Sequence, residues 1–150
     1  MKNLLEDPEQ MGLVRSGAVP LEQVVEEFVR FNPAFAYMRR TANRDLEIGG
    51  KTIRKGDKVA MWYVSGNRDE AVIEDPDRFW IDRPNARHHL SFGFGVHRCM
   101  GNRLAEMQLR VLWEEIMKRF RFIEITGPVE RVQSSFVKGY ASMPVQLHPW

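Results

Sequence analysis

Apolar residues recur at helical spacing in two long stretches of the chain. The first stretch runs from residue 20 to residue 31, begins at a proline, and is followed by Pro33, which cannot continue a helix. The second stretch runs from residue 104 to residue 120 and is the longer of the two, with Trp113 on its buried side. A shorter helix is predicted over residues 8–16, because an Asp-Pro pair opens it and a Ser-Gly pair ends it.

Strands are predicted between and after these helices. Residues 34–41 and 58–65 are rich in aromatic and apolar side chains, and the turn residues between them predict a short hairpin. The apolar run over residues 59–64 has no alternation, so we expect both of its faces to be covered. Residues 122–125 and 143–147 predict the strands of a final sheet.

The composition is that of an ordinary globular chain and argues against several classes of protein. The 150 residues suit a single domain, with 43% hydrophobic and 28% charged residues. A net charge of +2 is too small to indicate a nucleic acid or a membrane surface as partner. The single cysteine rules out an intrachain disulfide and fits a reducing compartment, and no run approaches the ~18 apolar residues of a membrane span.

The single cysteine lies in a loop over residues 91–101 that reads Ser-Phe-Gly-Phe-Gly-Val-His-Arg-Cys-Met-Gly. Its glycines allow backbone turns that are closed to residues with a Cβ, so the loop can bring Cys99 close to a flat ligand. The start of the following helix, with Arg98 and Arg103 nearby, favours a deprotonated sulfur that binds iron. A cysteine taken in isolation, however, is more often a buried free thiol.

Two other kinds of site do not fit this loop. A dinucleotide-binding Gly-x-Gly-x-x-Gly turn would need a glycine where Arg98 stands. A structural zinc site would have one sulfur, from Cys99, and the three histidines nearby do not have the usual ligand spacing. The histidines considered are His88, His89 and His97.

Residues 92–101 closely resemble the haem-binding loop of the cytochrome P450 family, Phe-Gly-x-Gly-x-His-x-Cys-x-Gly, and all six specified residues are present. The resemblance implies haem b (iron protoporphyrin IX) as cofactor, Cys99 as its iron ligand and His97 as the partner of a haem propionate. It makes Arg40 a candidate second propionate ligand, although a solvated charge at a strand end is equally expected there. The cofactor-binding residues implied are Cys99, His97, Phe92, Arg40, Gly93 and Gly101.

Two shorter motifs precede the cysteine loop in the order that the family shows. Glu27 and Arg30 match Glu-x-x-Arg, and Arg78 lies in a match to Pro-x-Arg-Phe. In the family these residues form a buried network, so the resemblance implies a structural role for Glu27, Arg30 and Arg78. From spacing alone, Glu27 and Arg30 would be an exposed pair that stabilises its helix by about 0.2–0.5 kcal/mol.

The resemblance also implies a substrate pocket, although plain packing is at least as likely a role for each residue taken singly. The implied lining residues are Ala34, Phe35, Ala36, Tyr37, Phe136 and Val137.

The chain is most similar to the bacterial members of the family that hydroxylate alkanes and fatty acids. The resemblance implies a mainly α fold with a small β region, and it implies that residues 1–150 are the C-terminal haem-binding portion of one domain. The N-terminal part, with the oxygen-activating residues, would lie upstream, so the iron ligand is the one catalytic group expected here.

The implied reaction inserts one oxygen atom from O₂ into a C–H bond of a small apolar substrate. Ferredoxin and ferredoxin reductase would supply the electrons in a bacterial cytoplasm. The alternatives are a haem-binding module without oxygen chemistry and a protein that keeps the fold for a structural role.

Overall fold

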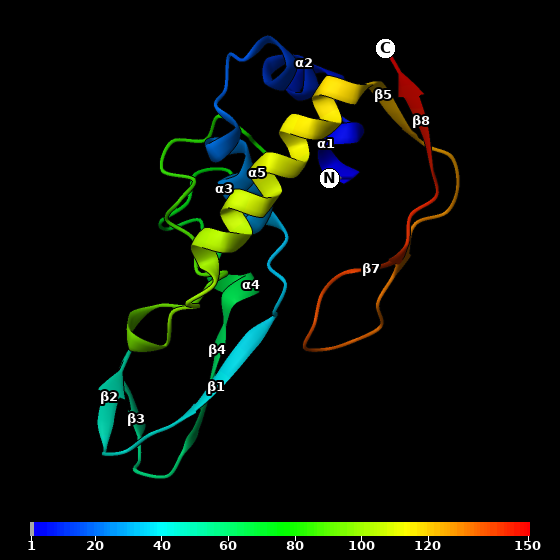
Figure 1. The fold of residues 1–150 in the computed structure, drawn as a ribbon. Coiled ribbons are helices and arrows are strands. Elements are labelled where there is room, and N and C mark those ends of the chain that lie inside the picture. The colour runs from blue at the N-terminus through cyan, green and yellow to red at the C-terminus, as the bar shows by residue number, and fades with distance from the viewer. Residues whose placement is uncertain (1) are drawn as a thin grey trace.

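The computed structural model describes residues 2–150, and helix α3 (Leu21–Phe31) lies at the centre of its helical part, behind α5 in Figure 1. Pro20 is the N-cap residue of α3, with φ of −60° and ψ of 138°, and Asn32 ends it. The apolar stripe that predicted this helix is buried, since Val24, Val25 and Phe28 are 7% exposed or less. Helix α3 is therefore the platform on which the other helices pack.

The N-terminal residues add two short helices, α1 (Lys2–Leu5) and α2 (Pro8–Ser16). The capping residues of α2 act as predicted, because the Asp7 carboxylate accepts the N–H of Gln10 at 3.1 Å and Gly17 takes a left-handed φ of 72°. Helix α1 was not predicted. It forms around Leu4, which is fully buried in the core.

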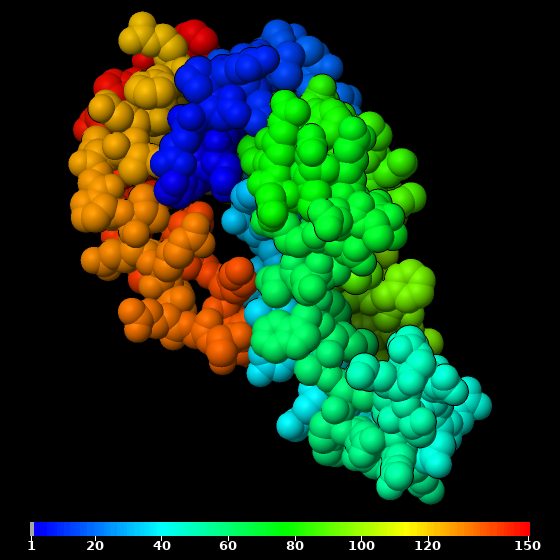
Figure 2. All heavy atoms as spheres, turned by 180° about the vertical axis from the view of Figure 1, so that it is seen from behind, coloured from blue at the N-terminus to red at the C-terminus, as the bar shows by residue number. Residues whose placement is uncertain are grey.

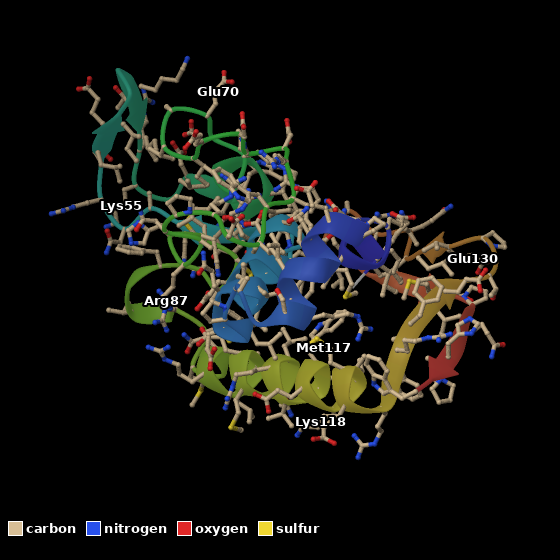
Figure 3. All side chains as sticks on the ribbon, turned by 90° about the horizontal axis from the view of Figure 1, so that it is seen from above. Lys55, Glu70, Arg87, Met117, Lys118 and Glu130 are labelled. Carbon is tan, nitrogen blue, oxygen red and sulfur yellow. The ribbon has the colours of Figure 1, made fainter. Side chains whose placement is uncertain are left out.

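The longest helix, α5 (Asn102–Arg119), lies across α3 and closes the core from the other side (Figure 1). Its Trp113 is 2% exposed and stacks on Phe28 with ring centroids 5.4 Å apart, and Phe28 stacks in turn on Phe79 at 5.7 Å. Met117 projects from α5 toward α2 and packs against the same core (Figure 3). The buried members of this core are Leu4, Val14, Val19, Val24, Phe28, Phe79, Ile81 and Trp113.

The first β region points away from the helices (Figure 1). Strand β1 (Tyr37–Thr41) pairs antiparallel with β4 (Lys58–Trp62), and β2 (Leu46–Ile48) pairs with β3 (Lys51–Ile53) around the predicted glycine turn. The prediction that the run over residues 59–64 is covered on both faces is wrong. The strand ends at Trp62, which is 52% exposed, and helix α4 (Tyr63–Gly66) follows it, because the described part of this sheet has only two strands and no second layer.

The C-terminal strands form as expected and extend into an arm. Strand β5 (Phe120–Ile125) continues directly from α5 and pairs antiparallel with β8 (Val145–Pro149). A smaller pair that was not predicted, β6 (Glu130–Arg131) with β7 (Tyr140–Ser142), lies farther along the arm. The arm returns to the body where Phe35 bridges to Val137, and Figure 2 shows the hollow between this orange segment and the rest of the molecule.

A buried ionic network fixes the irregular segment that leads from β4 to the cysteine loop. Glu27 and Arg30 are 0% and 1% exposed and share a bidentate ion pair at 2.6 and 2.8 Å. Arg30 also donates to the carbonyl oxygens of Asn67 at 2.7 Å and Pro76 at 2.9 Å. Because the Glu27 and Arg30 side chains are buried, the alternative of a solvent-exposed helical pair is wrong. The two residues belong to a buried network.

Arg83 completes this network in place of Arg78. The Nε of Arg83 lies 3.4 Å from a Glu27 carboxylate oxygen, and its Nη2 donates to the carbonyl oxygens of Asp75 at 2.8 Å and Arg78 at 3.0 Å. The Arg78 side chain is exposed and lies over the Trp80 ring, because its turn directs the carbonyl inward and the side chain outward. The prediction that the Arg78 side chain belongs to the network is therefore wrong.

Replacing Glu27 by Ala should lower the free energy of unfolding by about 3–5 kcal/mol, because Arg30 and Arg83 then stay buried without a counter-charge. Arg83→Ala should also destabilise the fold, because it leaves carbonyl groups without donors. The matched variant Arg78→Ala should change the free energy of unfolding by less than about 0.5 kcal/mol. Urea unfolding followed by tryptophan fluorescence measures all three, and equal losses in Arg78→Ala and Arg83→Ala would contradict the assignment.

Candidate functional site

The cysteine loop doubles back on itself at its glycines. Gly93 and Gly95 have φ of 72° and 75°, and a Cβ at Gly93 would lie 3.1 Å from the Tyr63 hydroxyl. The N–H of Cys99 then donates to the carbonyl of Phe92 at 2.9 Å, which closes the loop. The glycines are therefore needed for backbone shape, and the short 3₁₀ turn η1 (Gly95–His97) lies between the two limbs.

The loop presents the sulfur of Cys99 at the start of α5. Gly101 is the N-cap residue of that helix, and a Cβ placed on it would lie 3.8 Å from the Cys99 Sγ. The cysteine is exposed and free. This is the opposite of the buried free thiol that is the commoner state of an isolated cysteine.

A largely apolar cavity of about 550 Å³ lies in front of the sulfur. Its volume is within the range of small-molecule and cofactor sites, about 300–1,000 Å³. Its walls come from α3, from the segment that leads into β1, from β1 itself, from α4, from the cysteine loop, from α5 and from β7. The lining residues are Phe28, Val29, Asn32, Ala34, Phe35, Met38, Arg40, Tyr63, Ser91, Phe92, His97, Cys99, Ala105, Leu109 and Tyr140.

The structure brings the sequence-predicted cofactor residues to this cavity. Cys99, His97, Phe92 and Arg40 all line it, although Arg40 is distant in the sequence from the loop. The Arg40 side chain donates a hydrogen bond of 3.0 Å from its Nη1 to the carbonyl of Arg39. A guanidinium has five N–H groups, so others remain to bind a ligand. Gly93 and Gly101, by contrast, act through the backbone of the cysteine loop: Gly93 allows its positive φ, and Gly101 lies next to the sulfur.

The six predicted pocket residues divide into two groups. Ala34 and Phe35 line the cavity. The others support the wall from behind, since Ala36 is 5% exposed and donates its N–H to the Phe136 carbonyl at 2.8 Å. Tyr37 contacts Phe136 at 5.6 Å between ring centroids, and Val137 forms the bridge to Phe35.

Comparison with known proteins decides the family. A sequence profile of the family described as Cytochrome P450 matches residues 19–144. The chain belongs to the cytochrome P450 family.

Individual relatives agree with this assignment. Linalool 8-monooxygenase of Pseudomonas putida is 44% identical over 146 residues, which are 97% of this chain and 36% of that protein. Steroid C26-monooxygenase of Mycolicibacterium smegmatis is 35% identical over 150 residues, 99% of this chain and 37% of that protein. The chain thus spans little more than a third of these curated relatives.

Solved structures confirm the predicted fold class. Cytochrome P450-153 from Novosphingobium aromaticivorans is 48% identical and superposes with a TM-score of 0.88, over 94% of this chain and 36% of that one. CYP108D1 from the same organism superposes with a TM-score of 0.92 at 34% identity, over 99% of this chain and 36% of that one. In residues 2–150, no helix combines the length and the apolar character that crossing a membrane requires.

The cavity fits the thiolate-bound haem that the cytochrome P450 family implies. A haem needs a flat apolar slot, a thiolate on one side and cationic or polar partners for its two carboxylates. Cys99 supplies the sulfur at the helix start, and His97 and Arg40 line the same cavity. The remaining wall is mainly apolar, so the residues present suit this cofactor.

Several residues of this cytochrome P450 site were missed by sequence reasoning. Ala105 and Leu109 lie four residues apart on α5, the helix that begins just after Cys99, so they share one face of it. This spacing could have predicted that both line the cavity. Tyr63 and Tyr140 had no such signal, because each reaches the cavity through a chain reversal that the sequence pattern does not encode. Asn32 and Met38 flank predicted pocket residues and line the same wall.

Glu106 is the titratable group beside the cysteine loop with a clearly perturbed pKa. Its Oε2 lies 3.1 Å from the Arg103 guanidinium and 3.6 Å from that of Arg87, while its Oε1 is buried without a hydrogen-bond partner among the described residues. Burial, followed by the nearby Glu26 carboxylate, raises the pKa of Glu106 above its ordinary value. The charges of Arg87 and Arg98 lower the pKa of Glu106 without cancelling this shift.

Glu106→Gln should therefore become more stable relative to the unchanged protein as the pH rises from about 4.5, the ordinary pKa of the group. The folded state holds the proton more tightly than the unfolded state, so stability decreases as the pH rises through the raised pKa, and glutamine lacks this loss. Chemical unfolding at a series of pH values measures the difference.

The matched variant on the same helix is Glu115→Gln. Hydrogen bonds from Lys118 and then Arg119 lower the pKa of Glu115, so this carboxylate contributes stability that is lost as the pH falls below 4.5. Its replacement should give a pH trend of the opposite sign. If the stability of both variants, relative to the unchanged protein, changed with pH in the same direction, the opposite pKa shifts assigned to Glu106 and Glu115 would be contradicted.

Proposed function

We propose that this chain is the haem-binding C-terminal part of a cytochrome P450 monooxygenase that hydroxylates an alkane or a fatty-acid-like substrate. The observation that carries the proposal is the exposed Cys99 thiol, presented by a glycine-shaped loop to an apolar cavity that also contains His97 and Arg40. When bound, a haem with a thiolate ligand supplies the activation of O₂. The other roles belong to residues of this chain.

The cofactor-binding roles follow from chemistry and position. Cys99 is the iron ligand, favoured as a thiolate by the N–H groups at the start of α5. His97 and Arg40 bind the two haem carboxylates by charge-assisted hydrogen bonds. Phe92 lines the cavity together with Cys99, and with haem bound it would help to keep water from the sulfur, which strengthens the electrostatic interactions of a thiolate.

The substrate side of the cavity supports an apolar substrate. Ala34, Phe35 and Met38 line the cavity with apolar surface, and the arm supports them through Phe136 and Val137. Such a wall binds hydrocarbon by excluding water and makes no directional demand on the substrate. The relatives named for linalool and for a steroid also act on largely apolar molecules, and alkane or fatty-acid chains fit the same wall.

The exposed face of α5 supports the proposal that this chain works within a longer one. Leu104, Met107, Val111 and Leu112, all large apolar residues of the longest helix, are 54%, 49%, 44% and 48% exposed. Exposed apolar surface of this kind marks an interface. The part of the relatives' length that this chain does not span is the partner that we propose for this face, so residues 1–150 alone should not hydroxylate a substrate.

The test of the proposal is Cys99→Ser in the complete enzyme, meaning this chain with the preceding segment. The unchanged enzyme should show the strongly red-shifted Soret band of the reduced carbon monoxide complex and should form alcohol from an alkane. The serine variant should lose both, because an alcohol oxygen is a far weaker donor than a thiolate.

Each negative result has a definite meaning. A serine variant that keeps the red-shifted band would overturn Cys99 as the ligand. An unchanged enzyme that shows the band without forming product would instead favour a haem-binding module without oxygen chemistry.

The electron donor should bind beside the cysteine loop. Arg98 is exposed and the Arg103 side chain is 70% exposed, so both present positive charge on the side of the cavity from which the sulfur projects. Arg87 contributes less, because it contacts two carboxylates, of Glu26 and Glu106, and its side chain is less exposed than that of Arg103. An acidic ferredoxin, served by a ferredoxin reductase, matches this surface.

Arg103→Gln should slow reduction by ferredoxin and weaken its salt dependence, because charges at the rim of an interface act mainly on the association rate. Stopped-flow reduction measures this rate, with dithionite as the small reductant that needs no docking. Arg121→Gln, an exposed arginine on β5 away from the loop, is the matched control and should leave both rates unchanged. Equal slowing by ferredoxin and dithionite in Arg103→Gln would indicate damage to the haem site instead.

A further inference from the structure

A buried histidine lies at the entrance to the cysteine loop and has no role in the function proposed above. The side chain of His89 is 1% exposed, and its Nε2 lies 3.1 Å from the Glu26 Oε2. Its Nδ1 accepts the N–H of Ser91 at 3.2 Å. Because Nδ1 is the acceptor, Nε2 carries the ring proton and donates it to Glu26, so one tautomer and one ring orientation are fixed.

The fixed ring contacts the residue beside the sulfur. The centroids of the His89 and Phe92 rings are 5.8 Å apart, with the planes tilted by 50°. Phe92 in turn accepts the N–H of Cys99 through its carbonyl at 2.9 Å. His89 is therefore connected to the cysteine backbone through a single intervening residue.

The loop entrance is anchored on α3 by several hydrogen bonds. The Ser91 hydroxyl donates to the carbonyl of Val29 at 2.6 Å and accepts the Asn67 amide at 2.8 Å. The Asn67 side-chain oxygen accepts the N–H of Leu90 at 2.7 Å. With the backbone held directly after it, at Leu90 and Ser91, the His89 ring has little freedom to move away from Phe92.

Glu26 joins this arrangement to two further elements. Its carboxylate lies 3.4 Å from the Arg87 Nε, and the Arg87 Nη2 lies 3.6 Å from Glu106 on α5. Figure 3 shows Arg87, on the segment that leads into the cysteine loop, near the N-terminal end of α5. The carboxylate that orients His89 thus also ties α3 to the loop and, through Arg87, to the helix that begins just after Cys99.

We propose that His89, oriented by Glu26, is a positioning residue of the haem site that holds Phe92 and thereby the backbone presenting Cys99 to the iron. The inference rests on the proposed function, since it concerns haem bound through Cys99. Groups that orient a metal ligand from behind commonly affect metal affinity or activity by about 10–100-fold when removed.

His89→Asn in the haem-loaded complete enzyme tests the role. Asparagine keeps an acceptor for the Ser91 N–H, but its shorter side chain leaves no donor at the position of Nε2, which contacts Glu26, and no ring against Phe92. Transfer of haem to excess apomyoglobin should become about 10–100-fold faster. The reduction potential of the iron should rise, because a less firmly held thiolate stabilises the ferric state less. A purely structural role would not move this potential.

Three further variants sharpen the measurement. His89→Gln keeps a donor toward Glu26, so its rate of haem loss should lie between those of the unchanged enzyme and His89→Asn. Glu26→Gln keeps side-chain volume and an oxygen acceptor but removes the charge that orients the ring, and should shift haem loss in the same direction. His88→Asn, at the exposed neighbouring histidine, is the matched control and should change neither quantity.

The outcomes separate this inference from the function on which it rests. Unchanged haem loss and potential in His89→Asn, with the red-shifted band still dependent on Cys99, would overturn the role of His89 and leave the proposed function intact. If the unchanged enzyme itself shows no such band, the proposed function fails. Should His89→Asn not fold, Glu26→Gln decides alone, and an unchanged rate of haem loss in it would overturn the proposal.

Discussion

The ion pair between Glu27 and Arg30, with Arg83 as its third member, is the constraint on which the cysteine-loop side of the structure depends. A long irregular segment leads from β4 to the cysteine loop, so few ladder or helix hydrogen bonds hold it in place. The two arginines hold it instead, by donating to its carbonyl oxygens while the carboxylate neutralises one of their charges. Buried ionic groups of this kind are costly to separate, which makes one path of the backbone strongly preferred.

The site itself is built from parts that are far apart in the sequence. Helix α3 supplies the network and carries Glu26 on its surface toward the loop, while Asn67 connects α4 to the loop entrance. The cysteine then needs only a short glycine-shaped turn to reach the start of α5. Rigid elements thus hold the loop at both ends, which suits a ligand that must keep one orientation.

The sequence predicted those parts whose geometry is encoded locally. The cap of α2, the helix α3 and the glycines of the cysteine loop each follow from the conformational limits of a few adjacent residues. The identity of Arg83 as the third network member did not, because it depends on where an irregular segment runs. The same holds for Tyr140, which reaches the cavity only after the arm has folded back, and for the exposed face of β4, which depends on whether another layer is present.

The buried network also has a consequence for the order of events during folding. Its hydrogen bonds join Arg30 to carbonyl groups 46 and 48 residues later, and Glu27 to an N–H 53 residues later. The entropy of closing such loops must be overcome before the charges gain their partners, so these contacts form after the local helices. The loop that presents Cys99 lies beyond these contacts in the chain and is held against the same helix. Capture of the haem proposed to bind at Cys99 would therefore be a late step of folding, on a chain whose topology is already in place.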